Sequence, residues 1–230
     1  QTHQDNMGAF GGPDIITDGL VFLVDAASAR SYPGSGNTWY DLSGNNYDLT
    51  LTNGPVWNSA GYFDNDVDSY FTGAGGSNIP TGNDPYTMVV WARQNNSWGA
   101  SDGFISIGGF GVNGGSNALR TKSNSVGQFH HYWWYTDLSL SSNTGSLALG
   151  EWFQVAASFD GTTRRIWVNG VSRSSDTPTG HNVTSTTIQV SRTYTTEYQV
   201  GDMAIACIYD RALTSAEMLQ NYNAQKNRFI

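Results

Sequence analysis

The stretch from residue 127 to residue 135 has the side chains best suited to holding a ligand. Successive side chains of a strand point to opposite faces of its sheet. One face of this predicted strand would carry Phe129, His131, Trp133 and Tyr135, and the other His130, Tyr132 and Trp134. A core needs only one face. On the other, flat rings could stack on the C–H faces of sugars while histidine and tyrosine groups hydrogen-bond hydroxyls. The alternative, that loops cover this face and its rings serve packing alone, stays open.

Trp98 is the other aromatic residue that is difficult to bury. It lies in a loop over residues 94–102 that is rich in Gly, Ser and Asn. We interpret it either as an anchor for that loop or as a binding platform. The candidate ligand-binding residues are therefore His130, Tyr132, Trp134, His131, Trp133, Tyr135 and Trp98.

Three aspartates, Asp64, Asp66 and Asp68, are spaced like the start of a calcium-binding loop. The glycine and glutamate needed at the sixth and twelfth positions of such a loop are missing, and Ser69 occupies the former. We interpret the aspartates as the solvated tip of a hairpin between Tyr62 and Tyr70. The sequence predicts no metal-ligating residues and no cofactor, with a structural calcium ion as the remaining alternative.

Charge and composition exclude several classes of partner. The chain has 230 residues and a formal net charge of -8, which would repel a phosphate backbone, so we expect no nucleic-acid partner. No apolar run approaches the length of a membrane span, so we expect no membrane insertion. Cys207 is the only cysteine and its apolar neighbours predict a buried thiol. No signal peptide is apparent, and we expect the chain to be a processed piece of something longer.

The elements that position these residues are mostly strands. Residues 151–174 alternate apolar and polar side chains around two turns, the second of them Asn169-Gly170, and predict an antiparallel meander at the centre of a sheet. A dozen or more such strands predict an all-β fold, an antiparallel two-sheet jelly-roll sandwich. Thr214 and Glu217 form a capping-box pattern that predicts one C-terminal helix. We expect a flexible arm or linker over residues 1–18 and one domain over residues 19–230.

Three stretches, at residues 19–55, 151–170 and 203–218, resemble the laminin-G-like, concanavalin A-like lectin/glucanase superfamily. The resemblance is greatest to single-domain variants in bacteriophage virion proteins and bacterial surface proteins. It implies a jelly roll with one concave and one convex sheet, displayed outside a cell or on a virion surface. It also implies a glycan or protein as the ligand.

The resemblance bears on catalysis and on calcium as well. Hydrolases of this superfamily carry two glutamates around an aspartate on one strand, whereas Glu151, Glu197 and Glu217 share no strand face here. We therefore predict no catalytic residues and no enzymatic activity. The aspartate that often ligates calcium in relatives corresponds to Ala204, with Asp202 two residues away.

Two functions follow as expectations. The first is a non-catalytic, surface-displayed recognition domain, on a phage fibre, tail or capsid, with lectin-like binding to host glycans. The second is a purely structural capsid or tail decoration protein, which contacts other virion subunits through residues 1–18. A glycoside hydrolase is a weaker third alternative.

Overall fold

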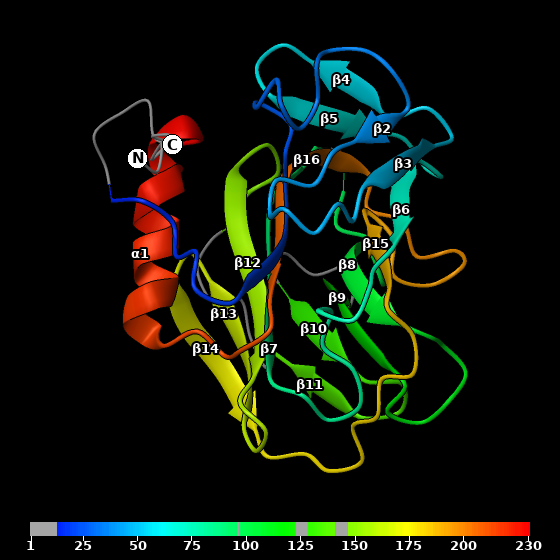
Figure 1. The fold of residues 1–230 in the computed structure, drawn as a ribbon, viewed down its shortest axis with the longest axis vertical. Helices are drawn as coiled ribbons and strands as arrows, with labels where there is room; N and C mark the ends of the chain where they lie inside the picture. Colours follow the sequence, from blue (N-terminus) through cyan, green and yellow to red (C-terminus); the bar gives the residue numbers. More distant parts are fainter. Residues whose placement is uncertain (1–12, 96, 123–127, 141–146) are drawn as a thin grey trace.

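The alternating strands of the sequence assemble into two antiparallel sheets packed face to face (Figure 1). A computed structural model of the chain describes residues 13–95, 97–122, 128–140 and 147–230. Apolar residues alternate along the strands, and the apolar side chains that point inward from both sheets form one continuous core. The predicted all-β sandwich with one C-terminal helix is confirmed.

Sheet A is the layer next to the helix. Its strands, in spatial order, are β14 (Val171–Asp176), β13 (Arg164–Val168), β12 (Trp152–Phe159), β7 (Tyr86–Gln94), β16 (Gly201–Tyr209), β5 (Tyr62–Asn65) and β4 (Val56–Asn58). Strand β1 (Leu20–Asp25) is the eighth strand of this sheet and pairs antiparallel with β16. The predicted meander of residues 151–174 is confirmed as β12, β13 and β14, but it forms one end of the sheet, and β7 and β16 lie at its centre.

Sheet B is the opposite layer. Its strands, in spatial order, are β11 (Asp137–Ser139), β10 (Phe129–Tyr132), β9 (Ser116–Thr121), β8 (Gly103–Gly108), β15 (Thr187–Val190), β6 (Tyr70–Ala74), β3 (Leu49–Thr52) and β2 (Thr38–Trp39).

The segment between Tyr62 and Tyr70 is not the hairpin that the sequence predicted. Strand β5 belongs to sheet A and β6 to sheet B. Phe63 of β5 and Phe71 of β6 meet inside the core, with ring centroids 4.9 Å apart. The two strands therefore face each other across the sandwich instead of pairing side by side.

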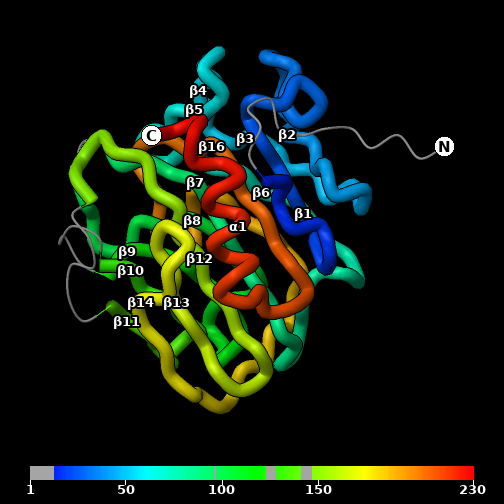
Figure 2. The backbone as a smooth tube through the Cα atoms, turned by 90° about the vertical axis from the view of Figure 1, so that its left-hand side faces the viewer, coloured from blue at the N-terminus to red at the C-terminus, as the bar shows by residue number. Residues whose placement is uncertain are grey.

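The outer face of sheet A is covered by helix α1 (Ser215–Gln225), which is followed by the short 3-10 helix η1 (Lys226–Arg228), as Figure 2 shows. The predicted capping box is confirmed: Glu217 N–H donates to Thr214 Oγ1 at 3.3 Å, and Thr214 N–H donates to Glu217 Oε2 at 2.8 Å. Met218 packs into a second apolar cluster with Trp91 and Cys207. Cys207 is the buried thiol that the sequence predicted, and burial raises its pKa to about 12.

Residues 13–18 pack against the helix side of the domain. Ile16 N–H donates to Asn221 Oδ1 at 2.8 Å, and its carbonyl accepts from Tyr209 Oη at 2.9 Å. Asp18 pairs with Arg211 at 3.0 Å. Residues 13–18 of the predicted arm thus lie against the domain, and its first twelve residues lie outside the described residues.

No helix in the described ranges combines the length and the apolar character needed to cross a membrane.

Candidate functional site

The outer face of sheet B carries polar and aromatic side chains in place of a helix. His130 and Tyr132 of β10 point outward from it, next to Arg120 of β9, with which β10 is paired. The loop over residues 191–198 lies against the same face, where Ser106 Oγ of β8 is 3.5 Å from the carbonyl oxygens of Arg192 and Thr193. This face is the best candidate for a binding surface because strands fix the positions of its side chains.

Strand β10 ends at Tyr132, three residues earlier than the sequence predicted. A tight turn over residues 133–136 connects it to β11, and Tyr132 pairs with Asp137 across the hairpin. The two central residues, Trp134 and Tyr135, have φ angles of 30° and 67°. Such positive values are rare for bulky side chains. The turn therefore carries backbone strain that a glycine or asparagine would largely relieve.

Two neighbouring groups hold this turn in place. Gly114 N–H donates to the carbonyl oxygens of Trp133 and Trp134 at 3.1 and 3.2 Å. Arg164 Nη1 donates to the carbonyl oxygen of Thr136 at 3.0 Å. The strained backbone is thus fixed from both sides.

The aromatic rings of the turn join rings from two distant loops. We call this surface the aromatic face and define it by His130, Tyr132, Trp134, Phe110, Tyr194, Arg120 and Glu197. The rings of Trp134, Phe110 and Tyr194 lie against one another, with centroid separations of 5.2 to 6.0 Å. The ring of Tyr132 is 5.8 Å from Trp134 and 5.6 Å from His130. Tyr135 extends beyond this surface and is 75% exposed.

A charged pair borders these rings. Arg120 forms a salt bridge to Glu197, and Thr193 Oγ1 donates to the other oxygen of Glu197 at 2.7 Å. The Arg120 guanidinium also lies 4.3 Å from the centroid of the Tyr132 ring. Flat apolar surfaces and hydrogen-bonding groups therefore alternate on one face.

His130 is neutral on this face at neutral pH. Burial, and then the positive charge of Arg120, lower its pKa to about 4, against the opposing effect of Asp137. Its Nε2 is 3.4 Å from Asp137 Oδ1 and has no hydrogen-bond partner within the described residues.

Four of the seven predicted ligand-binding residues are buried, among them His130, which is 6% exposed but points outward from sheet B. For the other three, burial in the core argues against the predicted contact with a ligand. His131 and Trp133 are 0% exposed and Trp98 is 5% exposed. Trp133 Nε1 donates to Tyr86 Oη at 2.8 Å, and Tyr86 Oη is 2.8 Å from His131 Nε2. These residues belong to the core because alternation along β10 directs every second ring inward.

Trp98 is a loop anchor. Its ring packs against Phe129 and Phe153 at centroid distances of 6.0 and 5.6 Å. The loop that carries it folds back over the edge of the core, and the sequence does not show which loops do so. The remaining four predicted residues, His130, Tyr132, Trp134 and Tyr135, lie together on the outer side of sheet B. Tyr132 and Trp134 are half-buried and Tyr135 is exposed, whereas His130 is buried beneath them.

Phe110, Tyr194, Arg120 and Glu197 were missed by sequence reasoning. Phe110 lies in a glycine-rich loop and Tyr194 in a threonine-rich loop. An aromatic residue in a polar loop is the same signal that indicated Trp98. The pairing of Arg120 with Glu197 spans 77 positions, and no local pattern indicates it.

The glutamates that the sequence analysis considered are engaged in separate places. Glu217 caps α1, and its hydrogen bonds from Arg211 lower its pKa to about 2. Glu197 pairs with Arg120 on the aromatic face. Glu151 Oε2 accepts the N–H of Ala148 at 3.0 Å.

The acidic groups considered for calcium are dispersed. Within the described residues, no three His, Cys, Asp or Glu side chains gather as metal ligands would. Asp202, the aspartate nearest the position used by calcium-binding relatives, accepts hydrogen-bonding contacts of 2.6 and 2.5 Å from Arg93.

Comparison with solved structures finds the same fold in several larger proteins. A Trypanosoma rangeli sialidase in complex with the inhibitor DANA superposes with a TM-score of 0.71 at 16% identity, covering 97% of this chain and 37% of that one. The botulinum neurotoxin serotype D binding domain has a TM-score of 0.67 at 16% identity, with 91% and 53% covered. The binding domain of Paraclostridial Mosquitocidal Protein 1 has a TM-score of 0.65 at 14% identity, with 92% and 53% covered.

This chain thus spans about a third to a half of the length of these structures. At such identities the likeness concerns the fold alone. No curated protein matches the chain in sequence. A laminin G family model, described as the concanavalin A-like lectin/glucanases superfamily, matches residues 63–218. That match covers more than half of the sequence, from β5 to the first turn of α1, and the chain belongs to this superfamily.

Proposed function

We propose that the chain is a non-catalytic recognition domain that binds glycans through the aromatic face. The observation that carries this proposal is the turn at Trp134 and Tyr135. Both residues occupy left-handed backbone conformations, which destabilise a non-glycine residue by about 1 to 3 kcal/mol each. Bulky rings at these positions do not serve the turn, so we infer that they serve a surface function.

The arrangement of groups suits a carbohydrate. Sugar rings present apolar C–H faces that pack on aromatic rings, and hydroxyls that exchange hydrogen bonds with polar groups at their margin. The half-buried rings of Tyr132 and Trp134 supply the first kind of contact. Arg120, Glu197 and the neutral imidazole of His130 supply donors and acceptors beside them.

Rigid support for these groups favours binding. Tyr132, His130 and Arg120 stand on paired strands, and the turn that carries Trp134 is fixed by Gly114 and Arg164. A ligand would therefore meet a preformed surface, which limits the conformational entropy lost on binding.

The comparisons agree with a binding role. The superfamily takes its description from lectins and glucanases. Two of the structures with this fold are titled as toxin binding domains, and a third is a sialidase in complex with an inhibitor. We extend to this chain only the recognition of glycans.

The absence of catalysis is the second part of the proposal. A retaining or inverting glycosidase needs one carboxyl group that is protonated near neutral pH and a second that faces it across the sugar. The pKa of Glu217 lies at about 2, and Glu197 is held by Arg120 and Thr193. Incubation with a panel of β-glucans should release no reducing ends, and release would contradict this part.

The setting is the third part, and it derives from the sequence resemblance. We propose that the domain is displayed outside a cell or on a phage virion. The structural alternative, decoration of a capsid or tail through residues 1–18, is less favoured because residues 13–18 contact α1 and β16 of their own chain. Mass spectrometry of purified particles and cell-surface fractions would locate the protein.

The direct test is binding of the wild-type chain and of Trp134→Ala to a glycan array. We expect the wild type to bind at least one class of glycan and Trp134→Ala to lose at least about tenfold in affinity, since stacked aromatic anchors dominate such sites. Tyr40→Ala is the matched control, because Tyr40 is exposed and lies outside the aromatic face. Equal binding by Trp134→Ala and wild type, or no binding to any glycan at millimolar concentration, would contradict the proposal.

A further inference from the structure

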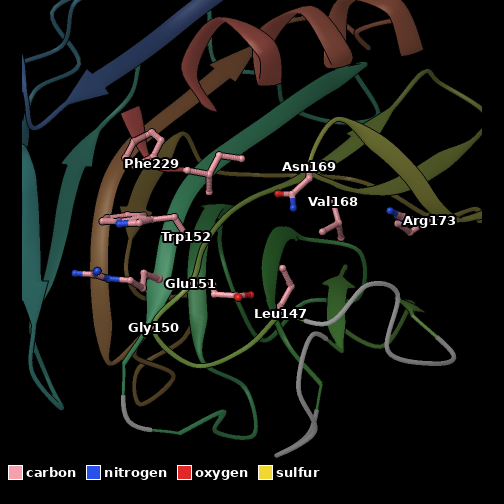
Figure 3. A pocket seen from close by; sticks show the side chains of 10 residues that line it. Leu147, Gly150, Glu151, Trp152, Val168, Asn169, Arg173 and Phe229 are labelled. Carbon is pink, nitrogen blue, oxygen red and sulfur yellow. The ribbon is translucent and has the colours of Figure 1, made fainter. Parts of the chain in front are cut away.

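A cavity of about 630 Å³ opens at sheet A, near the end of α1. Figure 3 shows Trp152 and Phe229 at one end of this cavity and Arg173 at the other. Glu151 also lines it, so a carboxylate offsets the charge of the exposed Arg173. One small ligand cannot reach both ends of this cavity. A more compact group of side chains lies on the opposite layer.

This group lies on the outer face of sheet B, which also carries the aromatic face. We call it the Arg192 site and define it by Tyr70, Gln189, Arg192 and Tyr198. Tyr70 of β6 and Gln189 of β15 point outward, because alternation along both strands directs their apolar neighbours into the core. Arg192 and Tyr198 follow β15 and are joined by an antiparallel β-bridge. All four side chains are half-buried.

The Arg192 guanidinium is held in one orientation. It lies 3.5 Å from the centroid of the Tyr70 ring and 6.0 Å from that of Tyr198, and the two rings are 6.0 Å apart. Arg192 Nε donates to Gln189 Oε1 at 2.9 Å. Its two Nη groups have no partner among the described residues. Because the side chain is already fixed, it loses little conformational entropy when a ligand binds to these two donors.

No carboxylate in the described residues forms an ion pair with Arg192, whereas Arg120 on the same face pairs with Glu197. Glu197, which precedes Tyr198, also accepts from Thr193 Oγ1 at 2.7 Å and is thus engaged. The net charge of the chain, -8, repels an anion at long range, but physiological salt screens charges more than about 8 Å apart. Contacts at the site itself therefore decide, and these favour an anionic group.

The loop over residues 191–198 connects the Arg192 site with the aromatic face. Tyr198 at the base of this loop lies beside Tyr70, whereas its neighbour Glu197 pairs with Arg120 of β9. Strands β15 and β9 are separated by β8 alone, so they lie about 10 Å apart at about 4.8 Å per strand. A glycan of several sugar units is long enough to contact both surfaces.

We propose that the glycan bound on the outer face of sheet B is acidic, and that Arg192 pairs with its carboxylate or sulfate group. The two Nη donors of a guanidinium match two oxygens of such a group. Neighbouring sugars of the same glycan contact the aromatic face. This inference rests on the proposed function and names the class of ligand that this face takes.

The test is a glycan array on which each acidic glycan, carrying a uronic acid or a sulfate, stands beside its uncharged counterpart, carboxyl-reduced or desulfated. We expect the wild-type chain to bind at least one acidic glycan at least about tenfold more tightly than its counterpart, because the charge-assisted hydrogen bonds are lost with the charge. The class that shows this preference, uronic acid or sulfate, identifies the anionic group.

Arg192→Gln should lower the affinity for the acidic glycan by about tenfold or more and leave that for its counterpart unchanged. Arg173→Gln is the matched control, because it removes the same charge from an exposed arginine of sheet A, and it should keep the preference. In an NMR titration of the wild type, the Arg192 Nε–H signal, assigned with Arg192→Lys, should shift with the acidic glycan and not with its counterpart.

The outcomes separate this proposal from the proposed function. Equal binding of both members of every pair, a preference that persists in Arg192→Gln, or an Arg192 signal that does not shift would overturn the proposal for Arg192. In each of these cases the recognition of glycans through the aromatic face stands if Trp134→Ala weakens binding. Absence of binding to any glycan, charged or uncharged, would contradict the proposed function itself.

Discussion

The guanidinium of Arg164 is fully buried, and each of its three nitrogens donates a hydrogen bond. It pairs with Asp176 through two contacts of 3.0 and 2.6 Å, donates to the carbonyl oxygen of Thr136, and lies 4.3 Å from the ring centroid of Trp133. On the other face of Trp133, His181 stacks at 3.9 Å. Because burying a charge is unfavourable unless it is fully compensated, Arg164 is a structural residue that also positions the aromatic turn.

Arg164→Ala is therefore expected to destabilise the domain by about 3 to 5 kcal/mol, the usual effect of removing one partner of a buried pair. Its neighbour in sequence provides the control. Arg165 pairs with Asp160 at 2.8 Å near the surface, and Arg165→Ala should change the free energy of unfolding by at most about 1 kcal/mol. Urea denaturation of both variants measures the difference, and equal effects would show that the burial of Arg164 contributes little.

At the scale of single elements, two hairpin turns contrast in what the sequence reveals. Asn169-Gly170 has the composition of a type I′ turn, and its φ angles of 51° and 75° confirm the prediction. Trp134 and Tyr135 also have positive φ angles, although neither is an asparagine or a glycine. A turn is predictable when its residues favour its backbone, and this second turn is instead imposed by contacts with Gly114 and Arg164.

The same distinction explains which site residues could be found from the sequence. Alternation along residues 129–134 separated the buried His131 and Trp133 from the outward His130 and Tyr132, but it could not say which set faced the core. That choice depends on which side of sheet B meets sheet A, and this is a property of the whole fold. The contribution of Phe110 and Tyr194 depends on loop geometry, for which the sequence has no periodic signal.

The strained turn leads to a prediction about stability. The double variant Trp134→Asn with Tyr135→Gly replaces both rings by residues that tolerate positive φ. Relief of strain should exceed the loss of ring contacts to Phe110 and Tyr194, so we expect a gain of about 1 kcal/mol in unfolding free energy. Thermal and urea denaturation measure it. A loss of more than about 2 kcal/mol would indicate that the rings stabilise the fold.

Packing of the helix against the second hairpin gives another prediction at this scale. Gly170 has φ of 75°, and a Cβ there would lie 2.9 Å from Tyr222 Cβ on α1. Gly161 has φ of 93° with no atom within 4 Å of a Cβ. Gly161→Ala should cost about 1 kcal/mol from backbone strain alone.

Gly170→Ala should cost at least about 1 kcal/mol more than Gly161→Ala, because the helix must also shift. The comparison uses the unfolding free energies of the two variants. Equal values would mean that α1 is loosely seated on the hairpin.

At the scale of the whole molecule, the two layers differ in what they present to the solvent. Sheet A is closed by α1, with Met218 and Leu213 packed against Trp91 and Trp167. Sheet B exposes polar and aromatic side chains supported by loops. Three histidines are buried, His131 and His181 between the layers and His130 on the outer side of sheet B, and burial lowers the pKa of each.

The histidines predict how stability depends on pH. The folded pKa of His181 is about 3 and that of His130 about 4, below the unfolded value of about 6.5. Between the folded and the unfolded pKa values, the unfolded chain therefore binds more protons than the folded one. The free energy of unfolding is thus highest above about pH 6.5 and decreases as the pH falls below it. The carboxyls of the exposed Asp64 and the half-buried Asp102, whose pKa values are raised by partial desolvation, oppose this trend.

We expect the melting temperature to fall between about pH 7.5 and pH 5.5, by an amount equivalent to about 1.4 kcal/mol for each histidine that stays neutral in the fold. His181→Asn should flatten this dependence, because the variant lacks one of the groups that must become charged on unfolding. A melting temperature that is constant or rises toward acid would contradict the assignment of these histidines as neutral and buried.

The central claim is that the aromatic face is kept for a ligand at the expense of stability. The most direct measurement is the glycan affinity of the Trp134→Asn/Tyr135→Gly variant, alongside its unfolding free energy. We predict a protein at least as stable as the wild type whose affinity falls by at least about tenfold. A variant that keeps the wild-type affinity would show that glycans bind elsewhere or that the rings of this turn have no part in recognition.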